Sequence, residues 1–174
     1  MAENARKTVL VVDDEADVRS FLKAALTEAG FLVITASDGF EAIEQIKKNT
    51  PDLISLDLVM PRKSGVILYR DLAKNKTWSK IPIIIVTGHA RDDLGKADLK
   101  ELTISGPGVY LEKPVRPDNY VAAVKSILGM DTSTEEKEKA EQVALQNQLK
   151  DIIDEADPET LRKIKMMLKG NKSE

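Results

Sequence analysis

Five polar side chains follow short apolar runs of the chain and are the residues best suited to chemistry. In chain order they are Asp13, Asp14, Asp57, Thr87 and Lys113. Three carboxylates brought together raise one another's pKa, and a hard divalent cation removes that repulsion. Mg²⁺ prefers oxygen ligands and usually binds through one or two carboxylates together with a phosphate. Because the chain has one histidine and no cysteine, these residues indicate an oxygen-ligated metal site.

The same side chains suit the transfer of a phosphoryl group. Beside a metal ion, Asp57 can act as the nucleophile. Lys113 offers a compact positive charge and Thr87 a hydroxyl donor, so that together with the metal they could contact all the phosphoryl oxygens. Each residue also has an ordinary explanation when taken alone, since an acidic pair before a helix is commonly a cap and a solvated turn. The hypothesis therefore depends on the five residues lying together.

Alternating strands and helices would bring these residues together. Continuously apolar runs predict five strands buried on both faces, at 8–12, 31–35, 53–56, 81–86 and 108–111. Helical spacing predicts five helices, around 18–26, 42–46, 66–74, 92–102 and 119–128. This alternation predicts an α/β fold, in which helices cover both faces of a parallel sheet. The carboxyl ends of parallel strands share one rim of the sheet, where the five side chains should meet.

The residues after Gly129 predict a separate helical extension. We divide the chain into a globular domain at 1–129 and, at 130–174, a polar linker followed by two helices. The first of these helices carries a narrow apolar stripe at Leu145, Leu149, Ile152 and Ala156. Asp157 and Pro158 should end that helix and begin the next one. The extension is therefore expected to be a helical hairpin or a bent helix.

Composition is typical of a soluble folded protein, with 42% apolar and 32% charged residues. The lack of cysteine excludes a disulfide framework and a thiolate metal or redox site. No signal-peptide region and no apolar stretch of membrane-spanning length occurs, so we expect a cytoplasmic protein without membrane insertion. Residues 1–130 carry 18 acidic and 18 basic groups. This balance argues against a general nucleic-acid-binding surface.

Four motifs, in order along the chain, resemble the receiver-domain signature of two-component response regulators. They are Val11-Val-Asp13-Asp14-Glu15, Leu56-Asp57-x-x-Met60-Pro61-x-x-x-Gly65, Val86-Thr87-Gly88 and Glu112-Lys113-Pro114. The resemblance covers residues 7–129 and extends to receivers of the chemotaxis-regulator type. It implies a flavodoxin-like fold, a doubly wound sheet of five βα units with strand order 2-1-3-4-5.

The resemblance also implies a role for each site residue. Asp57 would accept a phosphoryl group from a sensor histidine kinase or a histidine phosphotransfer protein. Asp14, Asp57 and the carbonyl of Val59 would bind Mg²⁺ (or Mn²⁺), and Asp13 would act mainly through a metal-bound water. The protein would be a phosphoprotein of a phosphorelay, catalysing only its own phosphotransfer and autodephosphorylation and thus not an enzyme in the usual sense.

A conformational switch is implied as well. Thr87 would move toward the phosphate and Tyr110 would turn inward behind it, reshaping the face formed by the fourth helix and the fifth strand. Without the motifs, an aromatic residue on a strand is commonly a core residue. Lys113 and Pro114 would be joined by a cis peptide bond. The 25 residues between Thr87 and Lys113 are a few more than a compact receiver needs, so the switch region is where this chain departs from the family pattern.

We expect phosphorylation to switch a surface that a downstream protein binds, although the sequence does not name that partner. One alternative is a degenerate receiver that docks or dimerises without phosphorylation. A DNA-binding transcriptional regulator is less favoured, because the 44 residues after Met130 contain no basic recognition helix. A nucleotide- or flavin-binding enzyme of the same fold would need a glycine-rich loop where this chain has Asp13 and Asp14.

The extension has an uneven charge distribution. Residues 134–159 hold nine acidic and three basic groups, whereas 160–173 hold five basic groups and no acidic one. The two helices could pair antiparallel within one chain or across a homodimer, which would bring their apolar stripes together. The hairpin could instead pack on its own domain.

Overall fold

The computed structural model describes residues 6–88, 109–130 and 156–170, together with eight helical positions from 134 to 153. The helix expected at 92–102, residue Gly108 and the stripe residue Ile152 lie outside the described residues. The strands are β1 Thr8–Val12, β2 Leu32–Ala36, β3 Leu53–Leu56, β4 Ile83–Thr87 and β5 Val109–Glu112. The helices are α1 Ala16–Glu28, α2 Gly39–Lys48, α3 Gly65–Lys74, the short 3₁₀ helix η1 Trp78–Lys80, α6 Pro117–Ile127 and α8 Pro158–Gly170.

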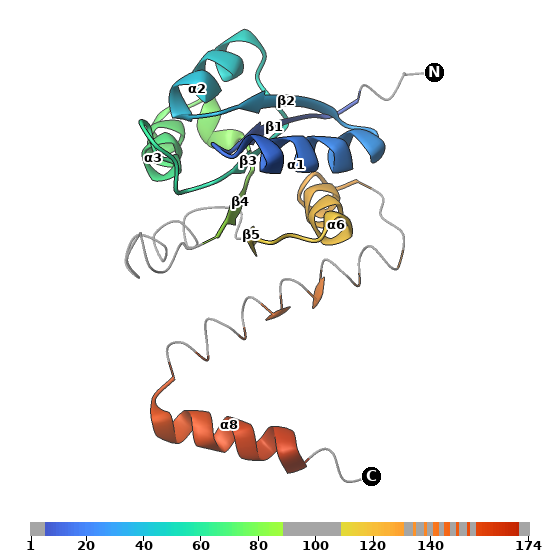
Figure 1. The fold of residues 1–174 in the computed structure, drawn as a ribbon, viewed down its shortest axis with the longest axis vertical. Helices are drawn as coiled ribbons and strands as arrows, with labels where there is room; N and C mark the ends of the chain where they lie inside the picture. The colour runs from blue at the N-terminus through green and yellow to red at the C-terminus, as the bar shows by residue number, and fades with distance from the viewer. Residues whose placement is uncertain are drawn as a thin grey trace.

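The five strands form one parallel sheet in the order β2-β1-β3-β4-β5, which confirms the expected flavodoxin-like topology (Figure 1). The central strands β3 and β4 are apolar except for Ser55 and Thr87, and every residue of both strands is buried. Continuous burial on both faces is what a parallel sheet between two helical layers requires. The strand pattern therefore follows from the hydrophobic signal, whereas the strand order was expected from the resemblance to receiver domains.

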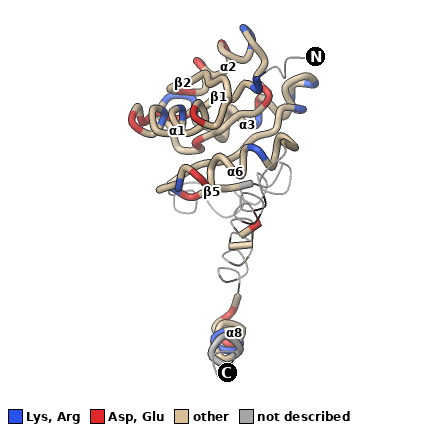
Figure 2. The backbone as a smooth tube through the Cα atoms, turned by 90° about the vertical axis from the view of Figure 1, so that its right-hand side faces the viewer, with Lys and Arg blue, Asp and Glu red and all other residues tan. Residues whose placement is uncertain are grey.

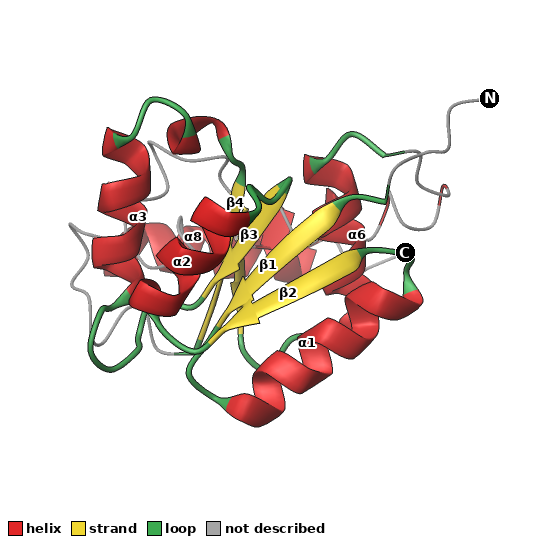
Figure 3. Cartoon of the chain, turned by 90° about the horizontal axis from the view of Figure 1, so that it is seen from above, coloured by secondary structure: helices red, strands yellow, loops and turns green. Residues whose placement is uncertain are grey.

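Two helical layers cover the sheet, with α2 and α3 on one face and α1 and α6 on the other (Figure 3). Successive residues of β1 point to opposite faces, as the period of a strand demands. Leu10 and Val12 join the core beneath α2 and α3, whereas Val9 and Val11 join the core beneath α1 and α6. Both layers are thus tied to the central strands that end at the rim.

Two strands begin one or two residues later than the apolar runs suggested, and hydrogen bonds explain both shifts. The amide of Phe31 donates to the carbonyl of Leu26 at 3.0 Å, so Phe31 closes the end of α1 and does not open β2. The amide of Ile81 donates to Trp78 at 3.0 Å, and Pro82 has no N–H to place in a ladder. Hydrophobic character alone does not separate a strand from the buried turn that leads into it.

The second helix of the extension starts where the sequence predicted. Asp157 caps α8, because its Oδ1 accepts hydrogen bonds from the amides of Glu159 and Thr160 at 2.9 and 3.1 Å. In Figures 1 and 2 this basic helix lies apart from the sheet and its covering helices. Among the described residues, no helix is both long enough and apolar enough to span a membrane.

Candidate functional site

Backbone hydrogen bonds beyond the strand ends place the expected residues on one rim of the sheet. The amide of Asp13 donates to Ala36 at 3.1 Å, that of Asp57 donates to Val12 at 2.9 Å, and that of Lys113 donates to Thr87 at 3.1 Å. These bonds continue the parallel ladders one step past the strands. The sheet register therefore determines where each functional side chain starts.

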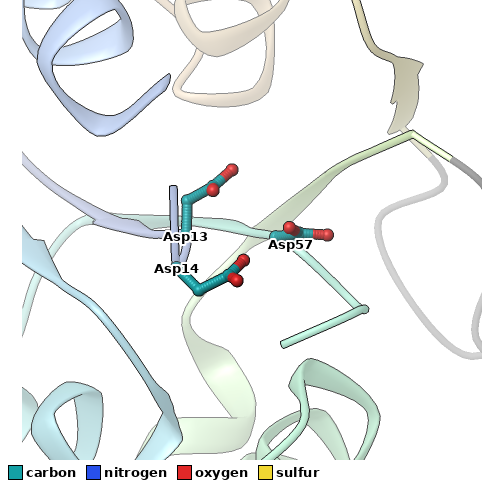
Figure 4. Close-up of side chains that lie close together, drawn as sticks. All are labelled: Asp13, Asp14 and Asp57. Carbon is teal, nitrogen blue, oxygen red and sulfur yellow. The ribbon is translucent and has the colours of Figure 1, made fainter. Parts of the chain in front are cut away.

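Three carboxylates converge at this rim. Asp13, Asp14 and Asp57 each offer an oxygen within 4.8 Å of the others (Figure 4). The carboxylates of Asp13 and Asp57 are buried, whereas that of Asp14 is exposed to solvent. Hard cations such as Mg²⁺ take carboxylate oxygens and retain several waters, so this all-oxygen donor set with one exposed side fits a divalent cation.

Lys113 supplies positive charge to the same group. Its Nζ lies 2.7 Å from Asp13 Oδ2, 3.1 Å from Asp57 Oδ2 and 3.1 Å from Glu15 Oε1. The contacts with Asp57 and Glu15 have hydrogen-bond geometry, and the shorter one with Asp13 is an ion pair. The ammonium therefore faces both buried carboxylates of the rim.

The pKa values of this cluster reflect burial and charge pairing. Burial raises the pKa of Asp13, because desolvation disfavours the carboxylate, although Lys113 opposes that shift. Burial alone would lower the pKa of Lys113, but Asp13 and Asp57 outweigh it and raise that pKa well above its ordinary value. Lys113 thus stays protonated at any physiological pH and acts as a fixed cation.

The loop after β3 is packed tightly around Asp57. The amide of Val59 donates to Asp57 Oδ1 at 3.1 Å, which orients the carboxylate from its own loop. A Cβ atom at Gly65 would lie 1.9 Å from the carbonyl oxygen of Asp57, so only glycine fits where α3 starts. The glycine of the motif therefore allows α3 to start directly against the backbone of the candidate nucleophile.

The same loop is anchored to α2. Arg62, which has a φ of 63°, forms an ion pair with Asp38, and the amide of Gly39 donates to the carbonyl of Lys63 at 3.3 Å. Asp38 also caps α2 by accepting from the amides of Phe40 and Glu41. One buried carboxylate thus joins the start of α2 to the loop that carries Val59.

Thr87 and Tyr110 lie on the neighbouring strands of the rim. Thr87 is fully buried, and within the described part of the chain its Oγ1 has no hydrogen-bond partner. Tyr110 is partly buried and packs against the core beneath α2 and α3. The peptide bond between Lys113 and Pro114 is cis. The Thr87 hydroxyl therefore lies at the rim without a hydrogen bond to any described residue.

Two residues of the site were given no role in the sequence analysis, although Glu15 is part of the first motif. Glu15, which follows the acidic pair, contacts Lys113 as described above. Arg19 Nη1 donates to the carbonyl oxygens of Asp13 and Asp14 at 2.7 and 2.9 Å, so it holds the backbone of the pair. A glutamate and an arginine at the start of an amphipathic helix read as ordinary solvated charges, and only the fold brings them to the rim.

Comparisons with known proteins give one consistent assignment. The sequence model of the response regulator receiver domain matches residues 9–125. A probable transcriptional regulator ycf27 of Pyropia yezoensis is 37% identical over 128 residues, which are 72% of this chain and 49% of that protein. The chain therefore spans about half the length of the curated relatives it matches.

Solved structures agree with the sequence comparison. A putative response regulator from Chloroflexus aurantiacus is 34% identical with a TM-score of 0.62, covering 71% of this chain and 98% of that one. The response regulator TrrA from Thermotoga maritima, in complex with Mg²⁺ and BeF, is 32% identical with a TM-score of 0.58, covering 70% and 98%. The rim of carboxylates, the sheet order and these matches together show that the chain belongs to the response regulator receiver domain family of two-component systems.

Proposed function

We propose that Asp57 accepts a phosphoryl group from a sensor histidine kinase or a histidine phosphotransfer protein, with Mg²⁺ or Mn²⁺ at the site. One observation carries the proposal: Asp57 lies within one small cluster that also contains two further carboxylates and the Lys113 ammonium. A structural ion-pair network would not need a third carboxylate open to solvent. The similarity to TrrA, solved with Mg²⁺ and BeF, supports the choice of metal.

Each residue of the site has its own role in the proposed phosphoryl transfer. A carboxylate oxygen of Asp57 forms a bond to phosphorus while the bond from phosphorus to the donor's histidine nitrogen breaks. Asp14, Asp57 and the Val59 carbonyl would hold the cation, with Asp13 acting mainly through a bound water. When bound, the cation would neutralise charge at the phosphoryl oxygens and help to align donor and acceptor. Lys113 and Thr87 contribute the remaining charge and hydroxyl donor.

The phosphorylated state would alter the surface near β4 and β5. Thr87 gains an acceptor for its buried hydroxyl if it moves toward the phosphoryl oxygens, and Tyr110 on the paired strand turns inward behind it. Ile85 and Tyr110 are register partners, so a shift at the end of β4 is transmitted to β5. We propose no turnover of a separate substrate: the protein acts on its own phosphoryl group alone.

Intact-mass analysis after incubation with a small phosphodonor tests the chemistry. We expect an adduct of one phosphoryl group that needs Mg²⁺ and is lost in Asp57→Asn. Asp17→Asn, which removes the same charge from the first turn of α1, is the matched control and should retain the adduct. A chain that forms no adduct under any condition would be a degenerate receiver acting as a docking module.

The output of the switch is proposed to be a protein partner in the cytoplasm. DNA binding is the second candidate, because the ycf27 relative is named a probable transcriptional regulator and this chain spans half of it. The balanced charge of residues 1–130 favours the protein partner. Titration of the phosphorylated chain with mixed-sequence duplex DNA at low salt would reveal DNA binding as a steeply salt-dependent signal.

We also propose that the C-terminal helices pair across a homodimer. In this structure Leu145, Leu149 and Ile153 are each about half exposed, at 54%, 49% and 45%. A helix as short as the 13 residues of α8 is marginal in water without packing, and the acidic 134–159 segment complements its basic charge. Sedimentation of the full chain and of a chain ending at Gly129 tests this. Identical monomeric behaviour at high concentration would rule the dimer out.

A further inference from the structure

Lys113 contacts three carboxylates, and one of them does not belong to the metal-binding group. Asp13 and Asp57 are members of that group, whereas Glu15 is not. The side chain of Glu15 is 63% exposed, compared with 2% for Asp13 and 5% for Asp57. Glu15 is therefore the one of these three carboxylates that would stay available to Lys113 when a divalent cation occupies the rim.

Lys113 and a divalent cation compete for the same oxygens. The ammonium is at ion-pair distance from Asp13 Oδ2 and from Asp57 Oδ2, at 2.7 and 3.1 Å. A cation held at the rim, directly by Asp57 and through a water by Asp13, would weaken the attraction of both carboxylates for the ammonium and would also repel it directly. Lys113 then keeps a place at the rim only if another acceptor remains.

Backbone hydrogen bonds hold Glu15 and Lys113 in place, so only side-chain movement can change which carboxylate the Lys113 ammonium contacts. The amide of Glu15 donates to Asp13 Oδ1 at 2.9 Å, and the amide of Lys113 is bonded to Thr87. Arg19, whose amide donates to the carbonyl of Glu15 at 3.0 Å, belongs to the same first turn of α1. Glu15 is therefore held beside both the acidic pair and Lys113.

We propose that Glu15 is a positioning residue, which retains the Lys113 ammonium at the rim when a divalent cation binds Asp14 and Asp57 beside Asp13. Its carboxylate allows the metal and the lysine to be present together, as phosphoryl transfer requires. The inference rests on the metal site of the proposed function. The proposal predicts that loss of the Glu15 charge weakens metal binding. Without Glu15, the cation must displace Lys113 from its carboxylates while no other carboxylate accepts the ammonium.

Mn²⁺ binding to the full chain, measured by calorimetry and by the spin resonance of free Mn²⁺, tests this. Glu15→Gln should weaken binding by about three- to fivefold, the scale of one exposed ion pair. Asp17→Asn, which removes an equal charge from the first turn of α1, should weaken binding by less than twofold. The extra loss in Glu15→Gln should fade in high salt, since exposed ion pairs are screened.

A double-mutant cycle decides whether Glu15 acts through Lys113. In a Lys113→Gln background, Glu15→Gln should change Mn²⁺ affinity no more than Asp17→Asn does. An equal loss with and without Lys113, or equal effects of Glu15→Gln and Asp17→Asn in the wild-type chain, would overturn the inference and leave the metal site intact. A wild-type chain that binds no Mn²⁺ would instead overturn the metal site, and the role of Glu15 with it.

Discussion

The hydroxyl of Thr87 is fully buried at the end of β4 and has no partner among the described residues. A buried hydroxyl without a hydrogen bond destabilises a protein by about 1–3 kcal/mol, whereas valine has the same shape without the polar atom. We expect Thr87→Val to raise the free energy of unfolding by about 1 kcal/mol, while shortening the life of the phosphorylated form. Urea unfolding and a time course of intact mass measure the two effects.

The outcome for Thr87→Val separates two explanations of this residue. A variant that is more stable but loses its phosphoryl group faster shows that the hydroxyl stabilises the phosphorylated form and destabilises the resting fold. A variant less stable than the wild type by 1 kcal/mol or more, on the scale of a lost hydrogen bond, would show that Oγ1 has a partner in the resting protein. Thr87→Ser, which keeps the hydroxyl, is the control.

The sequence was informative about single residues only where their types are restrictive. Asp57 and Lys113 could be predicted to meet, because each directly follows an apolar strand of a parallel sheet. Glu15 and Arg19 could not, since surface charges at the start of a helix are common and their partners depend on how α1 faces the rim. The ion pair between Arg62 and Asp38 likewise has no sequence signal, because it depends on a left-handed residue in the β3–α3 loop.

At the scale of the secondary-structure elements, the start of α3 depends on one residue. Gly65 opens this helix against the backbone of Asp57, where an added Cβ would lie 1.9 Å from a carbonyl oxygen. We expect Gly65→Ala to lower the free energy of unfolding by about 2–3 kcal/mol, the scale of an overpacked site, and to slow phosphorylation by displacing Asp57. Chemical denaturation and the intact-mass assay measure these changes.

Gly30 provides the matched control for that experiment. It has a φ of +94°, yet an added Cβ would meet nothing within 4 Å. Gly30→Ala should therefore cost only the backbone strain of a left-handed residue, about 1 kcal/mol, and leave phosphorylation unchanged. Equal losses of stability in the two variants would contradict the steric role assigned to Gly65.

The junction between α2 and the β3–α3 loop should be sensitive to acid through Asp38. Hydrogen bonding from the Glu41 amide is the main cause that holds the pKa of Asp38 below its ordinary value, with the Phe40 amide and Arg62 adding to it against burial. A depressed pKa means that the stabilisation is complete above the unfolded value of 3.8 and is lost as the pH falls through the folded value.

Asp38→Asn isolates that titration, because asparagine still caps a helix but carries no charge. We expect the free energy of unfolding of Asp38→Asn to fall less steeply than that of the wild type as the pH falls below about 4. Asp38→Ala should lose about 1 kcal/mol at neutral pH as well, since the cap is removed. If the free energy of unfolding falls equally steeply with decreasing pH in the wild type and in Asp38→Asn, this carboxylate has no role in the acid sensitivity.

At the scale of the whole molecule, the five strands and the two helical layers could be predicted, because burial on both faces of a sheet leaves a continuous apolar pattern. The strand order was predicted from the resemblance to receiver domains. Strand starts near Phe31 and Ile81 could not be predicted, since buried turns share the apolar pattern. The start of α8 was predictable from Asp157 and Pro158, whose capping chemistry is local.

Metal binding should stabilise the entire domain, since the rim joins residues from four strands and exists only in the folded state. A cation at 100 times its dissociation constant adds about 2.7 kcal/mol to the free energy of unfolding. We expect Mg²⁺ to raise the thermal unfolding midpoint of the wild type but to shift that of Asp14→Asn much less. Asp14 is the informative position, because its carboxylate is exposed and its removal leaves the buried pair of Asp13 and Asp57 with Lys113.

Scanning calorimetry in Mg²⁺, in EDTA and in NaCl of equal ionic strength makes this measurement. The NaCl sample shows how much of the Mg²⁺ effect is general charge screening. In EDTA, the wild type and Asp14→Asn should unfold within about 0.5 kcal/mol of each other, as expected for an exposed substitution. If Mg²⁺ shifts both proteins equally, the cation binds somewhere other than this rim. If it shifts only the wild type, the carboxylates of β1 and β3 act as one ligand set, and the stability of the fold is coupled to the chemistry of Asp57.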